Sequence, residues 1–280
     1  MFTNFAENAL VNSWFRSQAA YKPAAVYIGL LTAVTDAEAG TVTEVTGGSY
    51  ARQQIAQADA QWSAPATIND GGTDWREITN VNVLTFPTAT ANWGTITHFG
   101  VYDAATGGNL LGVVAFGSSR TINNSDTLSI GAGLLKLRMA GALTNFGRDR
   151  VLNGWFRTLA AYKPAAIHLG LLTAVADALA GTVTEVTGGS YGRQAITQAD
   201  AQWNAPANSS GAQQITNVNA INFPSSGAAT ANWGNISHFG VYDAGTGGNL
   251  LMVSAVDNVR TINSGDTGQV AAGILRIGAQ

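Results

Sequence analysis

The sequence predicts a mainly β protein, built from two tandem modules of the β-sandwich or jelly-roll kind, each with one N-terminal α-helix. Three observations lead to this prediction. They are a long internal repeat, one helical apolar pattern at the start of each repeat, and many short segments rich in Val, Ile and Thr. Only 11% of the 280 residues are charged although 46% are hydrophobic, so the polar part of the chain is mostly uncharged.

The internal repeat divides the chain into two copies. Two pairs of segments match, the first at 25 of 30 positions and the second at 17 of 20 (residues 21–50 with 162–191, and 92–111 with 232–251). A period of about 140 residues is far above the 20–50 residues of a solenoid repeat, so each copy is long enough to form a core of its own. We therefore expect domains at 1–140 (copy one) and 141–280 (copy two), which the short linker 139–143 holds in a fixed relation.

A helix is expected at the start of each copy. In copy one, Asn4 is a good N-cap and Glu7 stands three residues later, as in a capping box. An apolar helical face then continues to about Ala20. In copy two, Gly147 and Gly154 lie inside the equivalent segment and should weaken that helix by roughly 1 kcal/mol each relative to Ala.

Strands are expected to fill the rest of each copy. Pro23 and Pro164 end the helices, and the segment after each of them fits a strand that is buried on both faces. Residues 103–109 are expected to form a hairpin loop. Further strands in copy one are expected at Tyr50–Ala56, Val81–Phe86, Thr95–Tyr102, Leu110–Phe116, Thr127–Ile130 and Leu134–Arg138. Six or seven strands in about 140 residues favour a sandwich or jelly roll.

Composition and charge exclude several classes of function. Lys and Arg number 14 against 17 Asp and Glu, and no basic run occurs, so nucleic-acid binding is not expected. The absence of Cys excludes disulfides, thiolate catalysis and cysteine zinc sites. The longest apolar stretch, residues 24–34, is about half the length of a spanning helix, and the N-terminus has no basic leader, so neither a membrane partner nor a signal peptide is expected.

The motifs that could carry catalysis have simpler interpretations. Residues 188–192 read G-x-S-x-G, but a strand-like segment follows where a nucleophile elbow needs a helix, so a glycine-rich turn is favoured over a hydrolase. His98 and His238 occupy equivalent places in an alternating strand, with no second ligand at metal-binding spacing. A structural role is favoured for them over an interface or pH-sensitive role. We predict no catalytic, cofactor-binding or metal-binding residues, and no enzyme.

Tryptophan gives the clearest difference between the copies. Six of the seven Trp form equivalent pairs and favour packing over sugar stacking (Trp14 with Trp155, Trp62 with Trp203, Trp93 with Trp233). Trp75 has no counterpart and lies in the acidic segment 69–77, where a solvated loop is favoured over a calcium site because the usual ligand order is missing. The candidate interaction contacts are Trp75, Asp74, Glu77, His98 and His238.

Several motifs together resemble a family of small tailed-bacteriophage proteins. The motifs are NFAENALVNSWF, PAAVYIGLLTA, TEVTGGSYARQ, NWGTITHFGVYDAATGGNLL and RTINNSDTLSIGAGLLKL. Members of the family are commonly labelled phage tail fibre protein or virion structural protein. The resemblance covers nearly all of each copy, although this chain carries two modules in tandem. It implies a structural protein of the virion, assembled in the bacterial host cytoplasm, and brings no catalytic residues.

Two roles on the virion are open. We expect a capsid decoration or cement protein that clamps neighbouring major capsid subunits, because one chain with two similar surfaces can contact two quasi-equivalent sites. Its partners would be the major capsid protein or other virion proteins, with self-association on the particle. The alternative is a tail fibre, receptor-binding or adaptor component that recognises host-surface glycan, although the chain shows no heptad stalk or collagen-like run.

Overall fold

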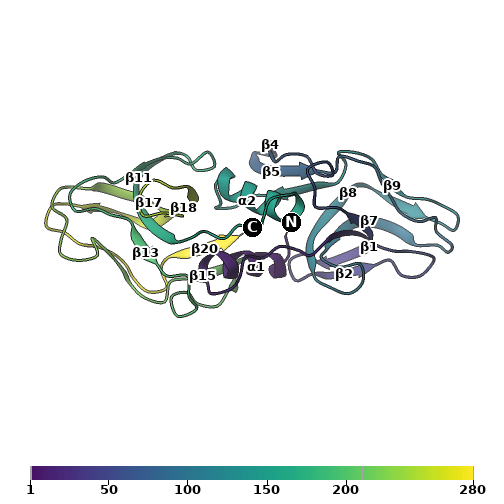
Figure 1. The fold of residues 1–280 in the computed structure, drawn as a ribbon, viewed down its shortest axis with the longest axis horizontal. Coiled ribbons are helices and arrows are strands. Elements are labelled where there is room, and N and C mark those ends of the chain that lie inside the picture. The colour runs from purple at the N-terminus through teal and green to yellow at the C-terminus, as the bar shows by residue number, and fades with distance from the viewer. Residues whose placement is uncertain (1, 210, 280) are drawn as a thin grey trace.

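The two copies lie end to end along the long axis of the molecule, with both helices near its middle. The computed structural model describes residues 2–209 and 211–279. Helix α1 (Asn4–Phe15) opens copy one and α2 (Asn145–Phe156) opens copy two, and both ends of the chain lie close to the helices (Figure 1). Strands make up most of the rest, which confirms the predicted mainly β class with one N-terminal helix in each copy.

Each copy has a large antiparallel sheet and smaller ones. The strands of copy one are β1 (Val26–Asp36), β2 (Thr41–Glu44), β3 (Gln53–Ile55), β4 (Ala66–Asp70), β5 (Thr73–Thr79), β6 (Leu84–Thr85), β7 (Gly94–Tyr102), β8 (Leu110–Ile122), β9 (Ser129–Ile130) and β10 (Lys136–Met139). The large sheet has the order β2-β1-β7-β8, with β3 also paired to β1. A small sheet has the order β10-β5-β4, and β6 pairs with β9.

Copy two repeats this arrangement. Its strands are β11 (Ile167–Asp177), β12 (Thr182–Glu185), β13 (Gln194–Ile196), β14 (Ala207–Ser209), β15 (Ala212–Thr216), β16 (Ile221–Phe223), β17 (Gly234–Tyr242), β18 (Leu250–Ile262), β19 (Gly268–Val270) and β20 (Arg276–Ala279). The large sheet has the order β12-β11-β17-β18 with β13 beside β11, and the small sheet has the order β14-β15-β20. The repeat in sequence is thus a repeat in topology.

The central strand β1 shows why the sequence pattern predicted the large sheet well. Its first half is buried, as expected for a strand covered on both faces. Gly29 is required there, because a Cβ atom would lie 2.7 Å from Oε1 of Glu44 and 2.8 Å from the ring of Tyr102. The loop at residues 103–109 joins β7 to β8 as predicted, and the Asp103 carboxylate accepts hydrogen bonds from the backbone and side chain of Asn109.

The small sheet corrects the sequence analysis. Residues 69–77 were expected to form a solvated loop, but they belong to the hairpin β4–β5, in which Asn69 pairs with Asp74 and Ile68 with Trp75. Gly71 and Gly72 make the turn at positive φ, and the strands form although Asp, Asn and Arg have weak β propensity. The polar strands β2, β4 and β5 were not predicted, because β2 has only four residues and β4 and β5 lack the alternation of a half-buried strand.

The helix boundaries also differ from the prediction. The N-cap of α1 is Thr3, whose hydroxyl accepts from the backbone N–H of Ala6, so Asn4 is already helical. The helix ends at Phe15, well before Ala20, because Arg16 has an extended conformation. No helix among residues 2–209 and 211–279 is long and apolar enough to cross a membrane.

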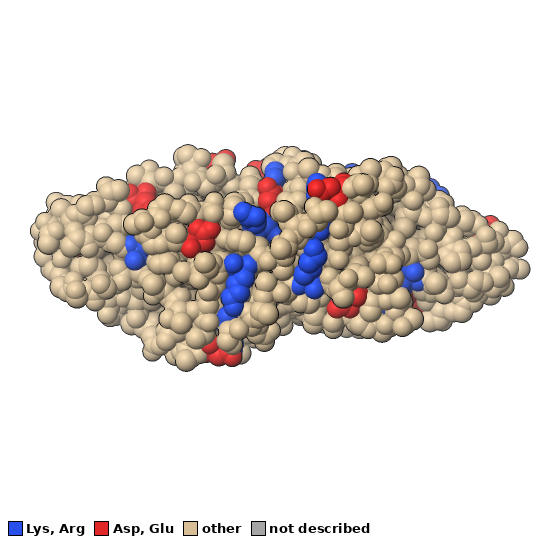
Figure 2. All heavy atoms as spheres, viewed as in Figure 1, with Lys and Arg blue, Asp and Glu red and all other residues tan. Residues whose placement is uncertain are grey.

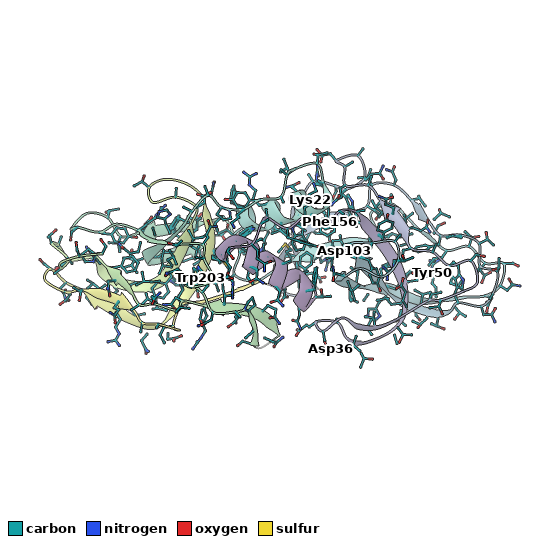
Figure 3. The ribbon with its side chains drawn as sticks, turned by 60° about the horizontal axis from the view of Figure 1, so that its bottom comes forward. Lys22, Asp36, Tyr50, Asp103, Phe156 and Trp203 are labelled. Carbon is teal, nitrogen blue, oxygen red and sulfur yellow. The ribbon has the colours of Figure 1, made fainter. Side chains whose placement is uncertain are left out.

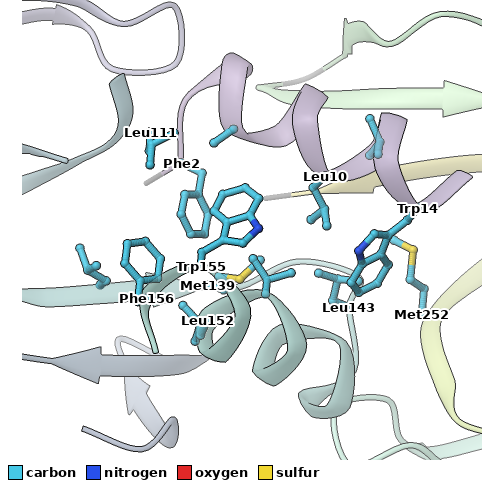
Figure 4. Close-up of a cluster of buried hydrophobic side chains, with 14 of the residues drawn as sticks. Phe2, Leu10, Trp14, Leu111, Met139, Leu143, Leu152, Trp155, Phe156 and Met252 are labelled. Atoms are coloured by element: carbon cyan, nitrogen blue, oxygen red, sulfur yellow. The ribbon is translucent and has the colours of Figure 1, made fainter. Parts of the chain in front are cut away.

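One continuous cluster of buried apolar side chains joins the two copies. Figure 4 shows its centre, where side chains of α1 and α2 meet residues of the linker and of both large sheets. All six paired Trp side chains are at most 5% exposed, which confirms their predicted packing role. The core therefore runs through the middle of the molecule.

Candidate functional site: the joint between the two copies

The helices are exchanged between the copies. Helix α1 of copy one packs against β15 and β20, in the small sheet of copy two, and α2 of copy two packs against β5, in the small sheet of copy one (Figure 1). Each helix starts on its own large sheet, since the backbone N–H of Thr3 donates to Leu111 and that of Thr144 donates to Leu251. We call α1, α2 and the small-sheet strands that they cover the joint.

Aromatic side chains fill the joint from both sides. Phe15 at the end of α1 lies against Trp203 of copy two, with ring centroids 5.3 Å apart, and Figure 3 shows Trp203 beside this helix. Phe156 at the end of α2 lies against Trp62 of copy one at 5.4 Å. These four side chains are at most 1% exposed, so each contributes about 1.5–3 kcal/mol or more by burial.

Mirrored hydrogen bonds cross the joint after each helix. Arg16 donates to Asp200 and Arg157 donates to Asp59, each over 3.1 Å. Hydrogen bonds from Arg16 and Ser17 lower the pKa of Asp200 to about 2. The chain after the helices, residues 16–20 in copy one, is therefore used as a contact with the other copy instead of as further helix.

Side-chain amides and ammonium groups add a second set of mirrored bonds, all to backbone carbonyls. Gln57 donates to the carbonyl of Trp155 and Gln198 to that of Trp14. Lys22 donates to the carbonyl of Leu159 over 2.9 Å, and Lys163 to the carbonyl of Gln18 over 2.6 Å. The joint thus binds the two copies through many directional contacts and a shared core, which indicates a rigid connection.

The buried charge of α1 is an acid. Glu7 is 3% exposed, and its Oε2 accepts from the backbone N–H of Gln213 in β15 over 2.8 Å. Glu7 thus serves the joint and not the capping box that the sequence predicted. Burial in the joint raises the pKa of Glu7 to about 7, because desolvation outweighs the hydrogen bond from Gln213.

The buried charge of α2 is a base at the equivalent position. Arg148 is 2% exposed and donates to the carbonyls of Asp74 and Gly141, and burial lowers its pKa to about 10. Beside it, Arg76 of β5 forms two hydrogen bonds with Asp149 of α2, over 2.7 and 2.6 Å. The hairpin β4–β5 of copy one thus contacts two charged side chains of α2, Arg148 and Asp149. The shorter hairpin of copy two has no charged side chain at the position equivalent to Arg76.

The structure places three of the predicted contact residues on this hairpin. The carbonyl of Asp74 accepts from Arg148, so this residue contributes to the joint through its backbone. Trp75 is half-buried opposite Ile68. Glu77 forms an ion pair with Arg138 over 2.6 Å and its side chain is only 11% exposed, so most of its surface is already used within copy one.

The two predicted histidines lie apart from this hairpin, in the large sheets of different copies. His98 on β7 and His238 on β17 are both half-buried, and each Nδ1 lies within 3 Å of a neighbouring hydroxyl, that of Thr97 or Ser237. Burial lowers the pKa of His98. The structure therefore does not bring the five candidate residues into one site, and their role as contacts with a partner stays a prediction.

A clamp present in both copies was missed by sequence reasoning. Arg52 forms two hydrogen bonds with Glu44, lies 3.3 Å from the ring centroid of Tyr102 and donates to the carbonyls of Ala104 and Gly107. Burial alone would raise the pKa of Glu44, but hydrogen bonds from Arg52 and Tyr50 hold it below its ordinary value. The clamp connects the motifs GGSYAR and THFGVYDA, since Arg52 of the first contacts Tyr102 and Ala104 of the second.

The counterpart clamp in copy two has the same geometry. Arg193 bonds Glu185 over 2.8 and 2.7 Å and lies 3.3 Å from the ring centroid of Tyr242. The identity of Glu, Tyr and Arg at these positions of both copies was the signal in the sequence. Both clamps hold the carbonyl groups of a loop and thereby position it.

The candidate catalytic motif is a turn. Ser190 has positive φ, and its hydroxyl lies within hydrogen-bond distance of the carbonyls of Gly189 and Ala228. Across the described part of the chain, no group of three His, Asp or Glu side chains could hold a metal ion. On the face in Figure 2, Lys and Arg gather around the waist of the molecule, where the joint lies, and the far ends carry few charges.

These features define a class: a β-rich protein made of two similar modules that share one core. The comparison with known families agrees. The family described as "Podophage GP4 fiber I protein gp80" matches residues 1–138 and, a second time, residues 142–278. The chain belongs to this family, which confirms the predicted resemblance to tailed-phage structural proteins. No curated protein matches the chain.

Family membership makes the protein a structural component of a phage virion of the fibre type, associated with other virion proteins. It also indicates a structural instead of an enzymatic role. Each family segment spans nearly one whole copy, so the tandem arrangement is two family modules in one chain.

Proposed function

We propose that the chain is a fibre component of a podophage particle, in which the fused pair of modules serves as one rigid segment. The observation that supports this role most directly is the match of both copies to a podophage fibre family. The exchanged helices fit the role, because they join the modules without a flexible tether. Recognition of a host-surface glycan, which the sequence analysis left open as the alternative role, belongs to this proposal as the task of the assembled fibre.

The fused joint has a physical advantage for a fibre. Two separate subunits lose translational and rotational freedom when they associate, at an estimated cost of about 4–15 kcal/mol. In this chain the second module is covalently present, so the joint forms as part of folding. We propose that residues 1–140 and 141–280 are the two units and that they act as a single body.

Capsid decoration is the second candidate, and the arrangement of the copies favours it. The two large sheets lie at opposite ends of the molecule (Figure 1), so similar surfaces face away from each other. A chain of this form could clamp two neighbouring major capsid subunits. The two roles differ in the position of the chain on the particle and in its number of copies.

Labelling of the chain on purified particles separates the candidates. A fibre component is expected at the tail in few copies, and particles from a gene deletion should keep intact heads and lose adsorption. A cement protein is expected over the whole head in many copies, and its deletion should lower heat resistance and leave adsorption unchanged. Absence of the wild-type chain from purified particles would contradict both roles.

A further inference from the structure

A cavity of about 760 Å³ opens in copy two, between strands β17 and β18 of the large sheet and the segment that leads into β19. Its floor is apolar and includes Phe223, Ile236, Phe239 and Val256. Its rim is polar and includes Asp257 and Arg260. A volume in this range is typical of sites that enclose a ligand group or an anchoring side chain, with an apolar floor and a few polar groups.

Copy one fills the corresponding space with its own side chains. Phe116 is the residue equivalent to Val256, and its ring lies 4.1 Å from the ring of Phe99, centroid to centroid. Leu128, equivalent to Gly268, is buried at 2% exposure. Copy two has therefore lost a phenyl ring and an isobutyl group from one place in the fold.

The smaller side chains of copy two leave one aromatic ring partly exposed. Phe99 of copy one is 3% exposed, whereas its counterpart Phe239 is only half-buried and lines the cavity. Elsewhere the floor keeps its counterparts, since Phe223 and Ile236 stand where Phe86 and Ile96 stand in copy one. Part of the cavity thus lies where copy one places the ring of Phe116 and the side chain of Leu128.

The residues at the rim of the cavity also differ between the two copies. Asp257 and Asn258 of copy two replace Gly117 and Ser118 of copy one. Asp257 is well exposed and only weakly paired, with Arg276 at 3.9 Å. Added hydrogen-bonding groups around an emptied apolar floor are the arrangement found where an aromatic anchor of a partner inserts and polar groups fix its backbone.

We propose that this cavity is the anchor site for an aromatic side chain of another virion protein, which occupies the place that Phe116 fills in copy one. The inference rests on the virion role above and names the chemistry of the contact. A polypeptide occupant is favoured because copy one fills the same space with side chains of a polypeptide, and because the protein is associated with other virion proteins. Copy one fills this place with Phe116 and Leu128, so we expect one anchor for each chain and therefore two unlike ends of the fused pair.

The site is tested first with the purified full chain and indole as the probe. Val256→Phe restores the residue of copy one and is expected to weaken indole binding, measured by ligand-observed NMR, at least about tenfold. Phe116→Val is the matched control, which should create a second indole site. Unchanged indole binding by Val256→Phe would overturn the proposal.

The partner is tested on particles. With benzoylphenylalanine at position 258, illumination of purified particles should join the chain to a different virion protein, and Val256→Phe should abolish that product. A product with a second copy of this chain, or no product, would overturn the proposed partner. The rim variant Asp257→Gly, with benzoylphenylalanine kept at position 258, should also lose the product, and it avoids any effect of a larger side chain on folding.

These results are distinguishable from a failure of the virion role. If the wild-type chain is missing from purified particles, the proposed function fails. If it is present and Val256→Phe particles give the same cross-linked product, only the anchor site fails. Gly268→Leu is less suitable as a test, because a Cβ atom there would lie 2.8 Å from Cδ1 of Ile262.

Discussion

The two halves of the joint have the same aromatic residues at the helix ends and different charges. Where α1 meets copy two, a buried Glu7 accepts a backbone hydrogen bond from Gln213. Where α2 meets copy one, the equivalent position is Arg148, which donates to two backbone carbonyls, and Arg76 pairs with Asp149 beside it. The aromatic contacts at the helix ends are nearly the same in both halves.

The fold requires the apolar contacts of the joint and tolerates different charges beside them. A helix that covers a small sheet requires its apolar face and the aromatic residue at its end, and both copies keep them. The polar position in the middle of the joint requires only a satisfied hydrogen-bonding group, so one copy uses an acid and the other a base. The two halves should therefore respond alike to loss of apolar contacts and differently to loss of polar ones.

The largest effect is expected from the aromatic ends of the helices. Phe15→Ala and Phe156→Ala each remove a fully buried ring that packs on a Trp of the other copy, so each should lower the free energy of unfolding by about 3–5 kcal/mol. Urea unfolding followed by fluorescence measures both. A loss in one variant at least twice that in the other would show that the apolar halves are not equivalent.

The next effect concerns pH and Glu7. In the folded chain the pKa of Glu7 is raised from an ordinary 4.5 to about 7, so the folded state binds more protons between these values and the free energy of unfolding falls as pH rises from about 4.5 to about 7. Glu38 lies near enough to add to this shift, and the N-terminus opposes it. The free energy of unfolding should fall by an amount on the order of 3 kcal/mol over this pH range.

Glu7→Gln should remove this part of the pH dependence and raise stability at pH 8 relative to the wild type, since the amide oxygen can still accept from Gln213. Thermal unfolding at pH 5 and pH 8 measures the difference. Arg148→Gln is the matched control, because the lowered pKa of Arg148 is about 10 and lies outside this range. An equal pH profile for Glu7→Gln and the wild type would contradict a buried, titrating Glu7.

A smaller effect on stability is expected from substitutions at Arg76 and Gln213, which occupy equivalent positions in the two small sheets. Arg76→Ala leaves the carboxylate of Asp149 without its two hydrogen bonds and should cost about 1–2 kcal/mol, since the pair is partly exposed. Gln213→Ala should cost less, because Glu7 is held by the backbone N–H of residue 213. The two variants are compared by urea unfolding, and equal losses would contradict the asymmetry of the joint.

The smallest effect is expected from the mirrored exposed pairs. Asp59→Asn and Asp200→Asn should each cause a slight and similar loss of stability. Because the pKa of Asp200 is lowered from 3.8 to about 2, its contribution is present above pH 3.8 and is lost as pH falls through about 2. Acid unfolding of the two variants measures this contribution. A large loss of stability in either variant would show that these ion pairs are important for the stability of the fold.

The sequence predicted the features that depend on local pattern. The helix at the start of each copy, the buried strand β1 and the hairpin β7–β8 have strong apolar periodicity, and all of them are present. The hairpin β4–β5 was missed because its Asp and Asn residues suit turns as well as strands. Its strand β5 is held by pairing with β10, which no local pattern reveals.

The exchange of helices could not be predicted, for a different reason. The two helices have similar apolar patterns, so these patterns do not indicate which small sheet each helix covers. One signal was available and not used, since Glu7 and Arg148 carry opposite charges at the same position of a buried helix face. A charge reversal between copies is a reason to look for a contact between them.

The central claim is that the copies form one body through exchanged helices, and hydrogen exchange of the Phe15→Ala variant tests it most directly. Phe15 belongs to copy one but packs on copy two. The account predicts that backbone amides of α1 and of residues 194–216 in copy two lose protection together. Loss of protection confined to residues 2–140 would contradict it.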